Sequence, residues 1–162
     1  MNSFWTRALV TGAFTAVLGT PVGGAFAASA LAADDLSPQT RADLDQSMRG
    51  EALANASYRL YAEQARQEGL PAVADLFERT ADVELGEHFK EEADLAGLVG
   101  TTRDNLSAAI AGEHYEAETM YPTFAERAEA AGDTEAATRF AHNAKDEADH
   151  ARAFEEARNQ LP

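Results

Sequence analysis

The sequence predicts an all-α fold, an antiparallel four-helix bundle made of two repeated helix pairs. The part of the chain after residue 40 is rich in alanine, glutamate and arginine and poor in glycine and proline, a composition that favours helices. Helix-start and helix-stop residues divide this part into four segments, and the first two segments resemble the last two. A chain of 162 residues is long enough for one domain with a real core.

The first 32 residues are expected to lie outside this fold. A short segment with one positive charge, Arg7, precedes an apolar run over residues 8–18, and small residues at cleavage-site spacing continue to Ala32. This order is typical of a secretory signal peptide, so we expect cleavage after Ala32 and export of a domain comprising residues 33–162 to the cell envelope (periplasmic space) or outside the cell. An uncleaved membrane anchor is the alternative, which the proline and glycines of this segment disfavour. No other long apolar run exists, so no membrane association is expected after cleavage.

Four helices follow in order. Ser37 as N-cap and Pro38 as first helical residue open the first, and the glycines at 69 and 132 are expected to end the first and third. The expected helices cover residues 37–68, 71–94, 101–131 and 133–158. Because the loops within each pair are short, the helices of a pair should be antiparallel neighbours. Pro122 should bend the third helix or disturb its hydrogen bonds.

The two helix pairs are copies of each other. At a shift of 63 residues, Phe77 matches Phe140 and Glu84 matches Glu147, whereas Gly50-Glu51 matches Gly112-Glu113 at a shift of 62. One residue is therefore inserted in the second pair, near the proline at position 122. Chance agreement in an alanine- and glutamate-rich background is the alternative, which the matching phenylalanines and glycines disfavour.

Two of the repeated glutamates should face the core. At about 100° per residue, Phe140 and Phe154 lie within about 20° of Glu147 on the fourth helix, and Glu84 has an equivalent place on the second. A glutamate in an apolar stripe is costly unless it is paired or binds a metal. His150 follows Glu147 by three residues, so both side chains lie on one helix face.

These residues predict a site for two metal ions. A chain without cysteine must hold metal through oxygen and imidazole, which suits iron, with manganese or zinc as alternatives. Di-iron bundles use one glutamate from each of two helices, here Glu51 and Glu113, and Glu-x-x-His from each of the other two. On the second helix, unbroken spacing from Glu84 puts Glu87 in the histidine position, whereas a one-residue bulge would bring His88 there instead. Both alternatives remain open.

Several motifs resemble the rubrerythrin family over about Gly50 to Leu161. The motifs are Gly50-Glu51 with Tyr58, Thr80-Ala81-Asp82 before Glu84, and Gly112-Glu113-His114-Tyr115-Glu116 followed by Met120-Tyr121-Pro122. The resemblance implies a ferritin-like di-iron domain and a set of metal ligands. That set is Glu51, Glu84, Glu113, Glu116, Glu147 and His150, with Glu87 or His88 as the seventh. Glu84 and Glu147 would bridge the metals. Glu116 would be the extra carboxylate typical of the family, and Tyr58 and Tyr121 would assist by hydrogen bonding to ligand carboxylates, unless they only pack in the core.

The resemblance implies a di-iron oxidoreductase of the peroxidase type, which acts on hydrogen peroxide or oxygen in oxidative-stress defence. An external electron donor is then needed, because a chain without cysteine cannot build a rubredoxin centre. A homodimer is expected from the resemblance alone. A ferroxidase or iron-handling protein and a metal-free helical binding module are the alternatives. The net charge of −15 argues against a nucleic-acid partner.

Overall fold

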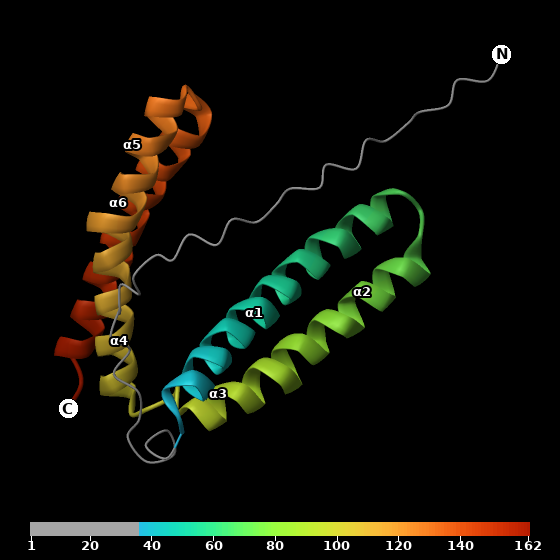
Figure 1. Cartoon of the computed structure of the whole chain (residues 1–162), viewed down its shortest axis with the longest axis horizontal. Coiled ribbons are helices and arrows are strands. Elements are labelled where there is room, and N and C mark those ends of the chain that lie inside the picture. Colours follow the sequence, from blue (N-terminus) through green and yellow to red (C-terminus); the bar gives the residue numbers. More distant parts are fainter. Residues whose placement is uncertain (1–35) are drawn as a thin grey trace.

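The computed structural model describes residues 36–162, and it is all-α over that range. The helices are α1 (Pro38–Gln67), α2 (Pro71–Val83), α3 (Lys90–Ala96), α4 (Thr102–Tyr115), α5 (Tyr121–Ala131) and α6 (Thr134–Asn159). Two π-helical segments, η1 (Glu84–Phe89) and η2 (Glu116–Met120), join α2 to α3 and α4 to α5 without a break. The described chain therefore forms four helical rods, and the predicted all-α fold of two helix pairs is confirmed (Figure 1).

The ends of the rods follow from local sequence. The Ser37 hydroxyl accepts a backbone N–H bond at the start of α1. Thr101 and Asp104 form a reciprocal capping box at the start of α4. Gly69 and Gly132 adopt φ values of 74° and 82°, in the left-handed region that glycine enters without steric cost, and they allow the two tight turns.

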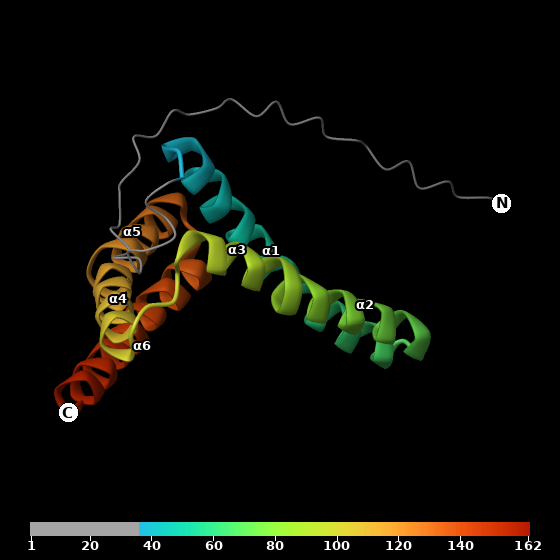
Figure 2. The ribbon, with the colours of Figure 1, turned by 90° about the horizontal axis from the view of Figure 1, so that it is seen from below.

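Each pair of rods forms a helical hairpin, and the two hairpins stand apart. Hairpin 1 (residues 38–96) packs α1 against α2, η1 and α3, and hairpin 2 (residues 102–159) packs α6 against α4, η2 and α5. Figures 1 and 2 show the hairpins diverging from the linker that joins α3 to α4. Among the described helices, none of hairpin 1 contacts one of hairpin 2.

The core inside each hairpin consists mainly of alanine. Its buried apolar residues are Met48, Ala62, Ala65, Ala74, Ala81, Ala93, Ile110, Ala128, Ala137 and Ala151. No large side chain is fully buried among the residues that the structure describes. Small side chains let two rods approach closely, but they bury little apolar surface.

Each hairpin also carries three neighbouring aromatic rings, at equivalent positions of the repeat. In hairpin 1 the ring centroids of Tyr58, Tyr61 and Phe77 lie 5.5 to 6.1 Å apart. In hairpin 2 those of Tyr121, Phe124 and Phe140 lie 5.6 to 6.3 Å apart. The matching clusters support the reading of the two hairpins as copies.

The π-helical segments explain the one-residue changes in the repeat. A π-bulge takes one extra residue into a helix. In η2 the Tyr121 N–H donates to the carbonyl of Glu116, five residues earlier, directly before Pro122. The proline ring would clash with the carbonyl four residues before it in a regular α-helix, and the wider turn reduces that conflict. The extra residue raises the repeat shift from 62 to 63, and η1 brings it back to 62 between His88 and His150.

No helix in the described part of the chain is both long and apolar enough to cross a lipid bilayer. The signal peptide predicted for residues 1–32 lies outside the described residues.

Candidate metal centre

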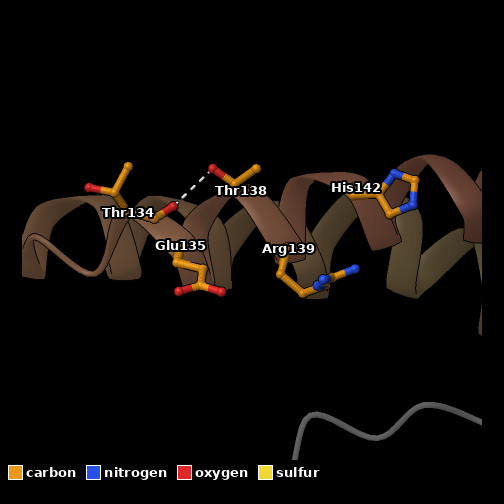
Figure 3. A pocket seen from close by; sticks show the side chains of 5 residues that line it. All are labelled: Thr134, Glu135, Thr138, Arg139 and His142. Atoms are coloured by element: carbon orange, nitrogen blue, oxygen red, sulfur yellow. Dashed lines mark hydrogen bonds between the residues drawn. The ribbon is translucent and has the colours of Figure 1, made fainter.

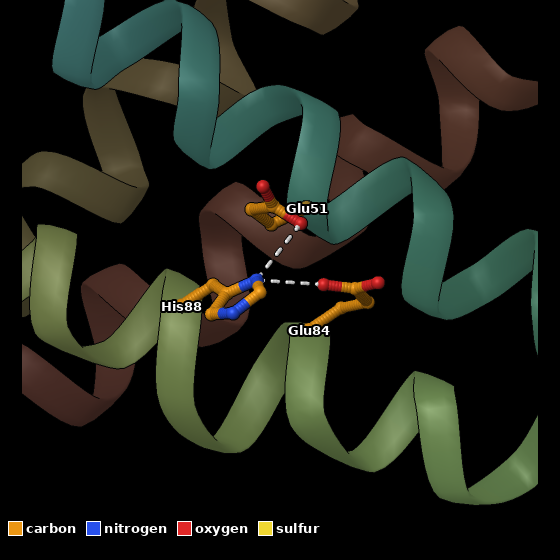
Figure 4. Close-up of side chains that lie close together, drawn as sticks. All are labelled: Glu51, Glu84 and His88. Carbon is orange, nitrogen blue, oxygen red and sulfur yellow. Dashed lines mark ion pairs between the residues drawn. The ribbon is translucent and has the colours of Figure 1, made fainter.

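Hairpin 1 brings three possible metal ligands together. Glu51 comes from α1, and Glu84 and His88 come from η1 (Figure 4). His88 Nδ1 lies 2.8 Å from Glu84 Oε2 and 3.9 Å from Glu51 Oε2. One ligand atom of each residue lies within 4.8 Å of the other two, which is close enough for a shared metal ion. We call this group half-site 1.

Hairpin 2 repeats this geometry. Glu113 comes from α4, and Glu147 and His150 come from α6. His150 Nδ1 lies 2.7 Å from Glu147 Oε2 and 3.7 Å from Glu113 Oε2. These distances are within 0.2 Å of those in half-site 1. We call this group half-site 2; the two half-sites are separate groups in the chain.

The carboxylates of the half-sites are shielded, whereas the histidines face outward. The side chains of Glu84 and Glu147 are 15% and 16% exposed, but those of His88 and His150 are 53% and 57% exposed. Each hairpin thus covers its carboxylates on one side and leaves the imidazoles uncovered.

Burial and mutual repulsion disfavour the ionised carboxylates. Burial raises the pKa of Glu51, and its hydrogen bond to Glu84 and the charge of Glu84 raise it further. Burial and then Glu147 act in the same way on the pKa of Glu113. The hydrogen bond to Glu147 raises the pKa of His150, which favours its cationic form. A bound metal cation would take over the role that these protons play in the metal-free protein.

A surface depression on α6 is not part of either half-site. It is lined by Thr134, Glu135, Thr138, Arg139 and His142 (Figure 3). His142 Nε2 lies 3.3 Å from Asp146 Oδ2, an ion pair along one exposed helix face. His142 is therefore a surface histidine.

Comparison with known proteins gives the family. The family model described as rubrerythrin matches residues 43–88 and 82–158. The chain belongs to the rubrerythrin family. It is 37% identical to a rubrerythrin of Porphyromonas gingivalis over 72% of this chain and 64% of the relative. It is 36% identical to a rubrerythrin of Nitratidesulfovibrio vulgaris, over 72% of this chain and 67% of the relative, and 31% identical to a nigerythrin of the same organism, over 75% and 67%. The chain thus spans about two thirds or less of the length of these relatives. A helical fold of two repeated pairs is consistent with the ferritin-like bundle that the sequence resemblance implied.

Within this rubrerythrin-family chain, the structure groups His88 with half-site 1 and leaves Glu87 outside it. The extra residue of η1 turns His88 onto the face of Glu84, four residues before it. Glu87 is exposed and is not part of the group. The sequence left these two positions open, and the bulge was the signal that could separate them.

Glu116, the carboxylate that the family resemblance singled out, lies at the start of η2. It is half-buried, and burial followed by the charge of Glu147 raises its pKa. It therefore lies within electrostatic reach of half-site 2, although it is not one of the three grouped ligands. The equivalent position in hairpin 1, three residues after Glu51, is Ala54.

The two tyrosines chosen from the rubrerythrin resemblance lie in the aromatic clusters. Tyr58 packs against Tyr61 and Phe77, and Tyr121 against Phe124 and Phe140. In residues 36–162, neither hydroxyl makes a hydrogen bond to a half-site carboxylate. A role for either tyrosine at the metal centre stays a prediction.

Three polar residues near the rubrerythrin-type half-sites were not anticipated from the sequence. Asn55 is buried and donates from Nδ2 to the Ala81 carbonyl at 2.6 Å, which ties α1 to α2. Ser47 donates to Glu92 at 2.6 Å, and the charge of Glu92 contributes to the raised pKa of Glu51. Helical spacing could have indicated Glu92, because it follows His88 by one turn and therefore lies on the same helix face.

His114 is a further polar link in hairpin 2. Its two ring nitrogens lie 3.0 Å from Glu118 and 3.0 Å from Glu155, so it bridges α4 to α6. These hydrogen bonds, with Glu155 first, raise the pKa of His114. These contacts make His114 a link between the two rods rather than a metal ligand.

Proposed function

We propose that the chain is a di-iron carboxylate protein of oxidative-stress defence that reduces hydrogen peroxide. The observation that carries the proposal is the duplicated half-site, in which two glutamates and one histidine converge twice with nearly the same geometry. Membership of the rubrerythrin family supports the same function.

The residues fit a pair of iron ions. Each half-site offers carboxylate oxygen and imidazole nitrogen and no thiolate, a donor set that suits iron. Joined, the half-sites supply one glutamate from each of two helices and a glutamate with a histidine from each of the other two. This is the ligand pattern of di-iron bundles, with His88 one residue later than the usual spacing. Burial, followed by the neighbouring Glu84 and Glu147, raises the pKa values of Glu51 and Glu113, and a bound cation would stabilise their ionised forms.

Each ligand has a place in the proposed centre. Glu84 and Glu147 each approach the histidine of their own half-site most closely, and their carboxylates are the more shielded, so they would hold the ions from the interior of each hairpin. Glu51 and Glu113 would add carboxylate oxygen, and His88 and His150 would add imidazole nitrogen. Glu87 is not assigned as a ligand, because it lies outside the group.

The chain's own residues can manage the protons of the reaction. Bound iron supplies two electrons and open coordination positions for peroxide. Conversion of one hydrogen peroxide to two waters also consumes two protons. The carboxyl of Glu116 has a raised pKa and lies near half-site 2, so it can hold a proton and deliver it to a substrate oxygen. The electrons must then be replaced by a reduced protein or small molecule from outside the chain.

Metal analysis and reactivity test this proposal. The purified chain is expected to bind two irons, and the reduced protein is expected to consume hydrogen peroxide faster than it consumes oxygen. Glu84→Gln with Glu147→Gln should abolish both properties, whereas Glu63→Gln, an exposed site on α1, should leave them unchanged. Rapid oxidation of iron(II) by oxygen without peroxide consumption would instead make the protein a ferroxidase, and stoichiometric zinc would remove the redox function.

A further inference from the structure

The two half-sites need each other, but one chain holds them apart. Each half-site offers only three ligands, and two metal ions in a carboxylate bundle need ligands from all four rods. No described helix of hairpin 1 touches a helix of hairpin 2 (Figures 1 and 2). The chain therefore carries two halves of a centre that it does not assemble in this conformation.

The linker is too short to close a ferritin-like bundle within one chain. In such a bundle one long crossover returns the chain along the length of the bundle before the third rod begins. At about 1.5 Å per residue, Glu84 lies about 18 Å from the end of α3 at Ala96, and Glu113 lies about 17 Å from the start of α4 at Thr102. With both carboxylates at one height and the two rods parallel, these ends are about 35 Å apart. Six Cα–Cα steps join them, which span at most about 21 Å.

The linker is also held in a fixed shape rather than left as a flexible hinge. Gly97 ends α3 in the left-handed conformation, and the Leu98 N–H donates to the carbonyl of Ala93. Gly100 exchanges two hydrogen bonds with the Asn105 side chain, of 2.8 Å and 3.2 Å. Together with the capping box of α4, these hydrogen bonds engage much of the linker backbone. They favour the conformation in which the two hairpins stand apart.

Both hairpins leave apolar surface uncovered beside the half-sites. On α2, Ala74 and Ala81 are fully buried, whereas Val73, Leu76 and Val83 are 41%, 55% and 36% exposed. The three exposed residues are spaced by three and seven, so they form one stripe, and at about 100° per residue Val73 lies within about 20° of Glu84. In hairpin 2, half-buried phenylalanines flank Glu147 at seven residues on either side. Such faces need a second pair of rods.

We propose that a second copy of the chain completes each centre. Hairpin 1 of one chain packs against hairpin 2 of its partner, and the reverse pairing forms a second bundle, so each two-metal centre takes ligands from both chains. A two-fold symmetric exchange of this kind gives every rod a second pair of rods to pack against, and it gives every half-site a complementary half-site. The inference rests on the proposed function, in that the two half-sites are taken to form one centre.

The first test changes the linker and needs no metal. The metal-free chain is expected to have the mass of a dimer by light scattering. Insertion of about 15 glycine and serine residues after Val99 lengthens the linker beyond the 35 Å gap, so it should yield a monomer at low protein concentration. The same insertion at Gly69, in the turn between α1 and α2, is the matched control and should leave a dimer. A monomeric unmodified chain, or a dimer that the linker insertion does not convert, overturns the proposal.

The second test asks whether ligands come from two chains. One variant carries Glu51→Gln and Glu84→Gln, and the other carries Glu113→Gln and Glu147→Gln. Each alone should bind little iron(II) under anaerobic conditions. After the two are unfolded together and refolded, half of the dimers are mixed, and each mixed dimer has one intact and one doubly altered centre. The mixture should therefore recover about a quarter of the iron bound by the unmodified chain.

The outcomes separate the two proposals. If the mixture binds no more iron than the separate variants while the unmodified chain binds two per subunit, each chain closes its own centre and the exchange is wrong. If the unmodified chain is a dimer that the linker insertion converts, yet binds no iron, the exchange stands and the di-iron function is wrong.

Discussion

At the scale of single residues, Glu87 and His88 are exposed neighbours, and only His88 belongs to half-site 1. His88 faces Glu84 and Glu51, whereas Glu87 lies outside the group. Residue type alone would not separate them, because both side chains can bind iron. What separates them is one extra residue in the helix, which decides the face on which each side chain lies.

Replacement of these neighbours tests the assignment of His88. His88→Ala is expected to weaken iron binding by at least about tenfold, because it removes a direct ligand and even indirect partners of metal sites have effects of this size. Glu87→Ala should bind iron as the unmodified chain does. Titration with iron(II), followed by the iron retained after gel filtration, gives both results. Loss of iron in Glu87→Ala with retention in His88→Ala would reverse the assignment.

The raised carboxyl pKa values predict the pH dependence of the metal-free protein. The pKa values of Glu51 and Glu113 lie above the ordinary value of 4.5, so the folded chain keeps protons that the unfolded chain has released. The free energy of unfolding should therefore fall as the pH rises from 4.5 through the raised values.

Denaturant unfolding in the presence of a chelator measures this effect. In the double variant Glu51→Gln with Glu113→Gln, the free energy of unfolding should fall less steeply over this pH range, since an amide does not titrate. The other acidic residues are common to both proteins and cancel in the difference. Parallel curves for the two proteins would contradict the prediction.

At the scale of elements, the four rods follow from local signals and the π-helical segments do not. Serine, threonine and glycine at the helix ends predicted bounds within about two residues of those observed, because capping depends on neighbours in the chain. The sequence indicated a disturbance at Pro122 and a bulge as one alternative at His88. The sequence could not decide whether the bulge near His88 forms, since the place of an extra residue in a helix depends on the rod against which that helix packs.

Deletion of Gly86 tests the role of η1. The deletion turns the sequence after Glu84 into Glu-x-x-His, the spacing that α6 already has, and lets a regular α-helix keep the histidine on the same face. Iron binding should persist, and the free energy of unfolding should rise by about 1 kcal/mol because a helical glycine is lost. Deletion of Arg79 in α2 is the contrasting variant, because it rotates every later residue by about 100° and should destabilise the fold. Equal damage from both deletions would show that η1 is needed for the fold.

At the scale of the whole molecule, the small core of each hairpin buries little apolar surface to stabilise it alone. Alanine dominates the interior of each hairpin, and no large side chain is fully buried in the described part of the chain. Sequence patterns pointed to five of the six grouped residues and left His88 open against Glu87, but they did not predict that one chain keeps the half-sites apart. That separation depends on the reach of the linker from Gly97 to Thr101, which no helical periodicity encodes.

Stability should therefore depend on protein concentration. If folding and dimer formation are coupled, the midpoint of thermal unfolding of the metal-free chain should rise with protein concentration. Circular dichroism over a hundredfold range of concentration measures it. The chain with the lengthened linker is the control, and its midpoint should stay constant. If the midpoint of the unmodified chain does not change with concentration, the chain is stable without a partner.

The signal peptide that the sequence predicts for residues 1–32 can be tested separately at this scale. We propose that the exported protein begins at Ala33, because small residues at cleavage-site spacing end at Ala32. The intact mass of the protein recovered from the cell envelope or the medium measures this start. An N-terminus at Met1 in a membrane fraction would favour the anchor instead.

One difference between the two copies has a chemical consequence for the proposed centre. Glu116 lies within electrostatic reach of half-site 2, whereas the equivalent place in hairpin 1 is held by Ala54. Duplication alone would give two interchangeable ions with the same redox potential. The carboxyl of Glu116 could therefore hold a proton beside half-site 2, and hairpin 1 offers no equivalent group beside half-site 1. The two ions would then have different surroundings although their grouped ligands are copies, and a bound substrate would receive its proton from the side of half-site 2.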